Sequence, residues 1–195
     1  MSIALAQHYV ETLLTEALPS NRIYHNLQHT RTVVQAVEKI ASAMEISSQS
    51  KEIILLAAWF HDTGHTQVFE GHEAVSQEIA WHFLKVQAYE TNVLQQIIDC
   101  IGATKMPQTP QNSLEAVMCD GDLPHLASTH FQEDAERLRR EWQLVLNKHY
   151  TDKEWLQQNI DFFQQHTYHS VYGKNILSPL KQQNFEHMRI QLSKL

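Results

Sequence analysis

Apolar residues recur along most of the chain at steps of three and four, and no segment sustains the two-residue alternation of a half-buried strand. The clearest pattern runs from Ile23 to Met44 and predicts a helix with one buried face. Further helices are expected at about Ile3 to Leu18, His72 to Gln87 and Val93 to Ile101. The chain is therefore expected to be helical over most of its length.

The segment from Ile53 to Phe60 is apolar on all sides. In so short a run, periodicity does not separate a buried strand from a buried helix. Its Leu-Leu-Ala-Ala centre and its helical surroundings favour a helix, and Gly64 supplies a stop signal after it. The two prolines between Met106 and Asn112 predict a loop.

Side chains that satisfy free backbone donors predict where the later helices begin. The candidate starts are Ser113, the pairs Thr129 with Gln132 and Thr151 with Glu154, and Ser178 before Pro179. The 195 residues include only five glycines and five prolines, and they show no repeat and no linker. These features predict one all-α domain, residues 1–195, folded as a bundle of about eight or nine helices.

Charge and composition narrow the function classes. Lysine and arginine number 15 against 22 acidic residues, and the net charge of −7 argues against nucleic acid as a partner. Trp142 and Trp155 fit helical core positions and have no basic surroundings that would make them a stacking platform. A small phosphorylated ligand remains compatible with the charge, because a metal ion reverses the field inside one cleft.

The longest apolar run is too short to cross a membrane. Cys100 and Cys119 belong to no C-x-x-C pair, which predicts reduced thiols. The first residues have neither a basic start nor a long apolar run, so no signal peptide is expected. We expect a cytoplasmic protein without a membrane partner.

The thirteen histidines exceed the four or five expected at roughly average usage, and several cluster. In Y-H-N-L-Q-H, His25 and His29 stand four apart and are expected on one face of the second helix, where both side chains reach one cleft. The alternative is that such a histidine is partly buried and has only a structural role. His61 and Asp62 end the apolar run, with His65 three residues later. Polar groups at a buried helix end need a partner such as a divalent cation. The alternative interpretation is that Asp62 only starts an exposed turn before Gly64.

Two weaker clusters follow. His72 and Glu73 open the fourth expected helix, where an acidic first turn favoured by the helix dipole explains them equally well. Asp120 and Asp122 stand two apart, a pattern that turns also show. The order of all these clusters is more specific than any one of them.

Taken in order, the motifs resemble the H…HD…D pattern of the HD superfamily of metal-dependent phosphohydrolases. They are Y-H-N-x-x-H-T at Tyr24 to Thr30, H-D-x-G-H at His61 to His65 and D-x-D-L at Asp120 to Leu123. The likeness covers roughly residues 20 to 130 and extends to small bacterial proteins described as predicted HD phosphohydrolases. It implies an HD-type helical bundle.

The resemblance also implies a metal site. The motifs carry over four ligands: His29, His61, Asp62 and one of the two late aspartates. Asp122 is preferred because D-x-D versions of the motif usually place the ligand second, which leaves Asp120 to orient a ligand. Asp120, His72 and Glu73 are the candidates for this supporting role or for a second metal. One or two divalent ions are implied, and Mn, Mg, Fe, Ni and Zn are not distinguished.

The same strings resemble the catalytic core of class I cyclic nucleotide phosphodiesterases. That likeness makes His25 the general acid for the leaving oxygen and Asp62 a bridge between two metals. His65 would bind near the second metal or hold the nucleophilic water. The chain is much shorter than those enzymes, and its sequence shows no glutamine and aromatic pair that would grip a purine, so a cyclic nucleotide is not specified.

The combined interpretation is an enzyme that hydrolyses a phosphoester in a nucleotide or related small metabolite, with metal-activated water as nucleophile. Lys105 and Thr104 are weak candidates for binding the phosphate, and simple exposure is the alternative for the lysine. A non-catalytic metal-dependent sensor and a di-iron HD oxygenase stay open, the latter because His65 and His72 are further histidines. His25 and His65 favour catalysis, since a metal holder needs neither. Nothing in the sequence indicates the oligomeric state.

Overall fold

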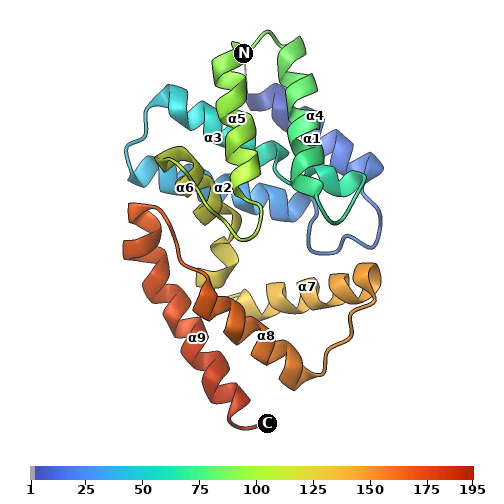
Figure 1. Cartoon of the computed structure of the whole chain (residues 1–195), viewed down its shortest axis with the longest axis vertical. Coiled ribbons are helices and arrows are strands. Elements are labelled where there is room, and N and C mark those ends of the chain that lie inside the picture. The colour runs from blue at the N-terminus through green and yellow to red at the C-terminus, as the bar shows by residue number, and fades with distance from the viewer. Residues whose placement is uncertain (1–2) are drawn as a thin grey trace.

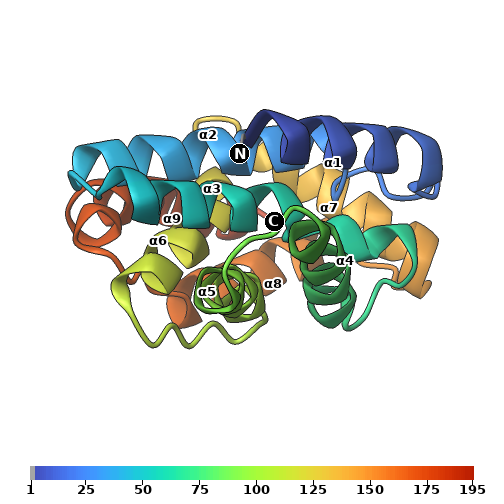
Figure 2. The ribbon, with the colours of Figure 1, turned by 90° about the horizontal axis from the view of Figure 1, so that it is seen from above.

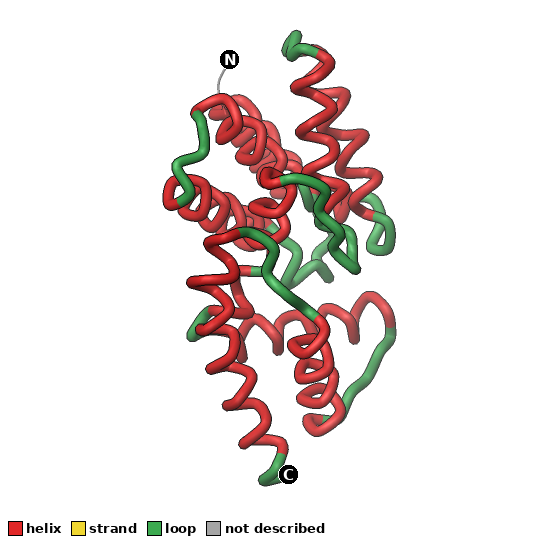
Figure 3. Tube along the Cα trace, turned by 60° about the vertical axis from the view of Figure 1, so that its left-hand side comes forward, coloured by secondary structure: helices red, strands yellow, loops and turns green. Residues whose placement is uncertain are grey.

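The structure, a computed structural model, describes residues 3–195, so the first two residues of the expected domain lie outside it. Within residues 3–195 the fold is entirely helical, with nine α-helices, three short turns of 3-10 or π type and no strand (Figure 3). The predictions of an all-α fold and of about eight or nine helices are confirmed. In this part of the chain, no helix combines the length and the apolar character needed to span a membrane.

The N-terminal bundle contains six helices: α1 (Ile3–Ala17), α2 (Leu27–Ala43), α3 (Ser48–Phe60), α4 (His72–Val86), α5 (Thr91–Ala103) and α6 (Ser113–Asp122). Helix α3 lies between α1 and α2 on one side and α4, α5 and α6 on the other (Figure 2). Every residue from Ile53 to Phe60 is buried, which explains why this stretch is apolar on all sides. The expectation of a helix there is confirmed.

Three more helices form a second hydrophobic cluster below the first in Figure 1: α7 (Phe131–Leu146), α8 (Asp152–Gln165) and α9 (Ser178–Leu192). The 3-10 turn η2 (Pro124–Ala127) leads from α6 into this cluster. Its buried side chains include Leu126, Phe131, Trp155 and Phe163. Helix α6 therefore ends where the two clusters meet.

Helix α2 begins later than the apolar pattern predicts. Asn26 is its N-cap, and the side-chain oxygen of Asn26 accepts hydrogen bonds from the backbone N–H groups of Gln28 and His29. The backbone of Asn26 is extended, so Ile23 and His25 precede the helix. The prediction that His25 and His29 share one helix face is wrong, because the cap separates them.

The predicted starts of the later helices have mixed outcomes. Thr151 and Glu154 form the predicted capping box of α8. Helix α6 is capped by Asn112 rather than by Ser113. Helix α7 has no side-chain cap, so the prediction for Thr129 is also wrong.

Two other helix ends differ from expectation. Helix α3 ends before Gly64, which lies in the 3-10 turn η1 (Thr63–Thr66). A Cβ atom on Gly64 would stand 2.0 Å from the carbonyl oxygen of His72, so the glycine allows this turn to approach α4 closely. Helix α9 continues directly from the π turn η3 (Gly173–Leu177), and Ser178 makes no cap.

Candidate metal centre

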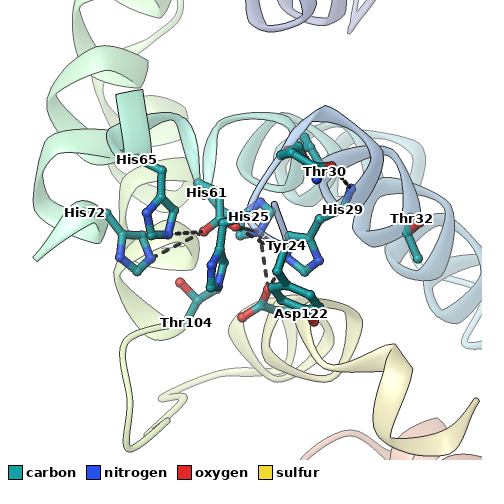
Figure 4. A network of polar contacts seen from close by, with 12 residues as sticks. Tyr24, His25, His29, Thr30, Thr32, His61, His65, His72, Thr104 and Asp122 are labelled. Atoms are coloured by element: carbon teal, nitrogen blue, oxygen red, sulfur yellow. Dashed lines mark hydrogen bonds and ion pairs between the residues drawn. The ribbon is translucent and has the colours of Figure 1, made fainter. Parts of the chain in front are cut away.

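The ends of three helices deliver four polar side chains to one point. His29 lies in the first turn of α2, His61 and Asp62 follow the last residue of α3, and Asp122 is the last residue of α6. Figure 4 shows His29, His61 and Asp122 converging. His61 and Asp62 are buried, whereas His29 and Asp122 are partly exposed.

The donor atoms of these side chains are spaced like ligands of one ion. The Nε2 atoms of His29 and His61 are 3.4 Å apart. The Oδ2 atom of Asp62 lies 3.3 Å from the first and 3.2 Å from the second, and Oδ1 of Asp122 lies 3.6 Å and 3.3 Å from them. Atoms that bind one ion at about 2.0–2.2 Å stand roughly 3 to 3.6 Å apart in tetrahedral or octahedral geometry.

Hydrogen bonding leaves these atoms available for a cation. Nδ1 of His61 lies 2.9 Å from the carbonyl oxygen of Ala58, which only accepts, so Nδ1 carries the proton and Nε2 presents its lone pair. Oδ2 of Asp62 is buried and has no hydrogen-bond partner among the described residues. A buried carboxylate oxygen without a partner is costly, and a divalent cation would satisfy it. Two imidazoles and two carboxylates suit a catalytic divalent metal.

The pKa values in the cluster reflect its negative charge. Burial lowers the pKa of His29, but the nearby carboxylates of Asp122 and Asp62 outweigh this effect and raise the pKa to about 9. Burial raises the pKa of Asp62, but the neighbouring imidazoles of His61 and His29, when they carry a second proton, hold it well below its usual range. The cluster therefore attracts positive charge, which protons or a metal ion provide.

Asp62 also faces a second group of imidazoles. Its Oδ1 atom lies 3.4 Å from Nε2 of His72 and 4.0 Å from Nε2 of His65. His25, Asp62 and His65 each offer a donor atom within 4.8 Å of the others. One oxygen of Asp62 thus faces His29 and His61, and the other faces His65 and His72.

His65 is the innermost ring of this second group. Its two ring nitrogens are buried and have no hydrogen-bond partner among the described residues. The ring stacks with those of His25 and His72, whose centroids are 4.4 Å and 3.9 Å away. Burial lowers the pKa of His65 to about 2, so the ring is neutral. Figure 4 shows His65 beside His72, whose Nδ1 is 3.0 Å from the carbonyl oxygen of Phe69.

A buried carboxylate from α7 holds His25 in place. The side chain of Glu141 accepts hydrogen bonds from the backbone N–H groups of Tyr24, at 2.7 Å, and His25, at 3.0 Å, and it also pairs with Nδ1 of His25. Burial raises the pKa of Glu141, but the hydrogen bonds and charge of His25 and the backbone amides bring it below its usual value. An ionised carboxylate only accepts, so Nδ1 of His25 carries the proton and Nε2 stays free.

Sequence reasoning missed Glu141. It is one of several charged residues in α7, and it lies 116 positions after His25. Its complete burial in a helix that is otherwise largely polar is the distinguishing feature, and no local pattern in the sequence shows it.

Asp120 does not lie with the ligand candidates. Two positions along a helix differ by about 200°, so Asp120 points away when Asp122 faces the cluster. Its carboxylate accepts hydrogen bonds from the backbone N–H groups of His169, at 2.7 Å, and Ser170, at 2.9 Å, and from the Ser170 hydroxyl. The expectation that Asp120 orients a ligand or serves a second metal is not met, because both its oxygens hold the segment between α8 and η3.

The remaining candidates divide between the site and the surface. His72, Glu73 and Thr104 line the cavity beside the cluster, and the Thr104 hydroxyl donates to the carbonyl oxygen of Ile101 at 2.8 Å. Lys105 is exposed and is not part of that lining, so the structure does not place it where it would hold a phosphate.

The cavity has a volume of about 220 Å³ and extends from the metal cluster to the second hydrophobic cluster. His25, His29, Asp62, His72 and Asp122 supply the polar part of its wall. Most of the apolar part comes from η2, α7 and α8: Leu126, Phe131, Ala135, Leu138, Trp142, Trp155 and Phe162. Trp142 and Trp155, expected at core positions, therefore also face this cavity.

A buried tyrosine and a histidine form another part of the wall that the sequence did not single out. The Tyr24 hydroxyl lies 3.1 Å from Nδ1 of His125. Burial and the nearby charge of His29 lower the pKa of His125 to about 3, so His125 is neutral. It therefore offers an acceptor or a donor to the hydroxyl according to its tautomer.

A protein-family model described as HD domain matches residues 26–143, which is more than half of the chain. The match includes the four ligand candidates and Glu141 and ends before α8 begins. His25 lies one residue before it. No curated protein and no solved structure matches the chain.

Proposed function

Because the chain belongs to the HD domain family, whose members are typically metal-dependent phosphohydrolases, we propose that it hydrolyses a phosphoester bond in a nucleotide or related small phosphorylated metabolite. The observation that carries this proposal is the cluster of two imidazole nitrogens and two carboxylate oxygens at 3.2 to 3.6 Å. A divalent cation bound there supplies a Lewis acid that activates water and offsets the charge of the phosphoryl oxygens.

In this proposal His29, His61, Asp62 and Asp122 hold the cation. The second oxygen of Asp62, with His65 and His72, provides the ligands for a second ion. The donor set accepts Mn, Mg, Fe, Ni or Zn. Glu73, at the edge of the cavity near His72, supports the second position.

His25 is the proton donor to the leaving oxygen. It lines the cavity, and its Nε2 atom is free because Glu141 accepts the proton on Nδ1. A buried carboxylate in this position orients the imidazole and stabilises its protonated form. A general acid of this kind typically contributes about 10² to 10⁴ in rate. The neutral ring of His65 stacks on His25 and keeps it in one orientation.

We also propose that residues 1–195 act as one domain in the cytoplasm. The N-terminal bundle supplies the polar side chains of the cavity wall, and the second hydrophobic cluster supplies most of its apolar side chains, so neither part forms the site alone. Cys100 and Cys119 are buried and unpaired, which agrees with a reducing compartment.

Replacement of Asp62 by alanine tests the function directly. Elemental analysis and hydrolysis of bis(p-nitrophenyl) phosphate, p-nitrophenyl phosphate and an alkyl phosphoester are measured with each of the five metals. Asp62→Ala should lose the bound metal and the turnover of every ester, whereas His25→Ala should keep the metal and lose most turnover of the alkyl ester, whose leaving oxygen needs a proton. Asp152→Ala, at a side chain that is 84% exposed, is the control for the loss of one carboxylate.

The possible results separate the competing interpretations. Full turnover in Asp62→Ala contradicts the assigned site. Stoichiometric metal in the native protein without cleavage of any ester contradicts the hydrolase and favours the sensor or the di-iron oxygenase.

A further inference from the structure

The cavity beside the metal cluster has an unusual charge pattern. Lysine and arginine are absent from the described residues that line it, and its charged carboxyl side chains are those of Asp62, Glu73 and Asp122. One phosphoryl group of a ligand is balanced by the bound cation. A second phosphate in the cavity would find no lysine or arginine to pair with, because the lining histidines face the metal positions or the leaving oxygen, and desolvating an unpaired anion is costly.

The far part of the cavity is aromatic. The rings of Trp142 and Trp155 meet edge to face, with centroids 5.4 Å apart, and Phe131 packs against Phe163 at 4.7 Å. Phe131 and Trp155 are buried, and Trp142 is partly exposed where it lines the cavity. The wall is therefore formed by side chains that their neighbours already fix, and a flat apolar group would bind it without reorganising it.

The size of the cavity limits what this group is. An engineered cavity of about 150 Å³ binds benzene, and about 220 Å³ leaves room for one or two aromatic rings. Asn159 and the exposed Gln158 add amide groups to the lining. The amide nitrogen of Asn159 donates to the carbonyl oxygen of Trp155 at 2.7 Å, so the oxygen of this amide remains available to a ligand.

We infer that the substrate carries a single phosphoryl group on an uncharged aromatic group, which binds against α7 and α8 while the phosphoryl group lies at the metal cluster. The inference rests on the proposed function and specifies its substrate class. The part of the wall on α8 lies beyond the residues matched by the family model, so the family match does not account for it.

Binding of phosphonates tests the inference separately from turnover, because their P–C bond is not hydrolysed. Calorimetry on the metal-loaded full chain compares naphthylmethylphosphonate with methylphosphonate and with a naphthyl analogue that carries a ring sulfonate. We expect the naphthyl compound to bind at least tenfold more tightly than either. A nucleoside 5′-phosphonate in the same series shows whether a nucleobase or a simple aryl group is the better occupant.

Two variants locate the bound group. Trp142→Ala should weaken binding of the naphthyl compound at least tenfold and leave methylphosphonate unchanged, whereas Trp142→Phe should keep most of the affinity. Leu144→Ala, at an exposed position of the same helix, is the control. Gln158→Lys adds a cation at an exposed position of the lining and should improve binding of the sulfonated compound several-fold without affecting the fold.

Equal affinity of the native protein for naphthylmethylphosphonate and methylphosphonate would overturn the inference, and so would tight binding of the sulfonated compound. An equal loss of both affinities in Trp142→Ala would also contradict it. These outcomes are independent of catalysis, because a failure of the hydrolase proposal appears instead as the absence of cleavage of every ester.

Discussion

Replacement of Glu141 by glutamine isolates the role of the carboxylate that holds His25. The native side chain accepts three hydrogen bonds, from two backbone N–H groups and from Nδ1 of His25. Glutamine keeps the shape, but it has one acceptor oxygen and adds an N–H donor. If the oxygen keeps the two backbone bonds, the new donor faces Nδ1 and forces the proton of a neutral His25 onto Nε2.

This change removes the stabilisation of the positive charge on His25, so the ring becomes a weak proton donor. General acid catalysis of this kind is worth about 10² to 10⁴ in rate, and we expect turnover to fall by about 10² or more for an alkyl ester. The mismatch in the buried site should cost about 1–3 kcal/mol of stability. A domain with a typical total of about 5–15 kcal/mol then remains folded.

The assay compares leaving groups. A p-nitrophenyl ester leaves without protonation, so Glu141→Gln should affect it much less than an alkyl phosphoester, and bound metal should stay at the native level. In the His25→Ala background, the same replacement should cause little further loss, because the two residues act as one unit. Equal losses for both esters, or full additivity of the two replacements, would show that Glu141 only stabilises the fold.

Two further predictions concern the fold around the site. Burial and the charge of Lys181 lower the pKa of His166 to about 3, so the folded protein keeps this ring neutral while the unfolded chain binds a proton below its pKa of about 6.5. The contribution of His166 to the free energy of unfolding is therefore complete above pH 6.5 and is lost as the pH falls. Urea unfolding at pH 7.5 and at pH 5 measures this loss, and between the two pH values His166→Gln should lose about 2 kcal/mol less stability than the native protein. Equal losses in the two proteins would refute the assignment. A Cβ on Gly173 would stand 2.0 Å from Oδ2 of Asp120, so Gly173→Ala should lower stability by about 1–3 kcal/mol and the melting temperature by several degrees. Gly102→Ala, where the added atom meets only the flexible end of a glutamine, should be nearly neutral; similar melting temperatures for the two variants would contradict this explanation.

Local patterns were sufficient for the fold class and for part of the site. Steps of three and four between apolar residues report the buried face of a helix, which is why the all-α fold was predictable. His61 and Asp62 are adjacent at the end of the buried helix α3, so their joint position followed from the chain itself. The position of His25 was also within reach, because asparagine is a favoured N-cap and Asn26 stands directly after it.

Long-range packing decided the rest. Asp120 and Asp122 have similar local surroundings in the sequence, and only the packing of α6 turns Asp122 toward His61 and Asp120 toward Ser170. Glu141 meets His25 across 116 positions. The aromatic wall likewise depends on how α7 and α8 pack against the first bundle.

The sequence by itself determined that the chain is helical, which faces of its helices are buried and which motifs carry candidate metal ligands. The tertiary structure decided which carboxylate joins the cluster, which glutamate supports the proton donor and which apolar residues face the cavity. The physical reason is that periodicity describes each helix about its own axis, whereas a site also depends on how separate helices are positioned against one another.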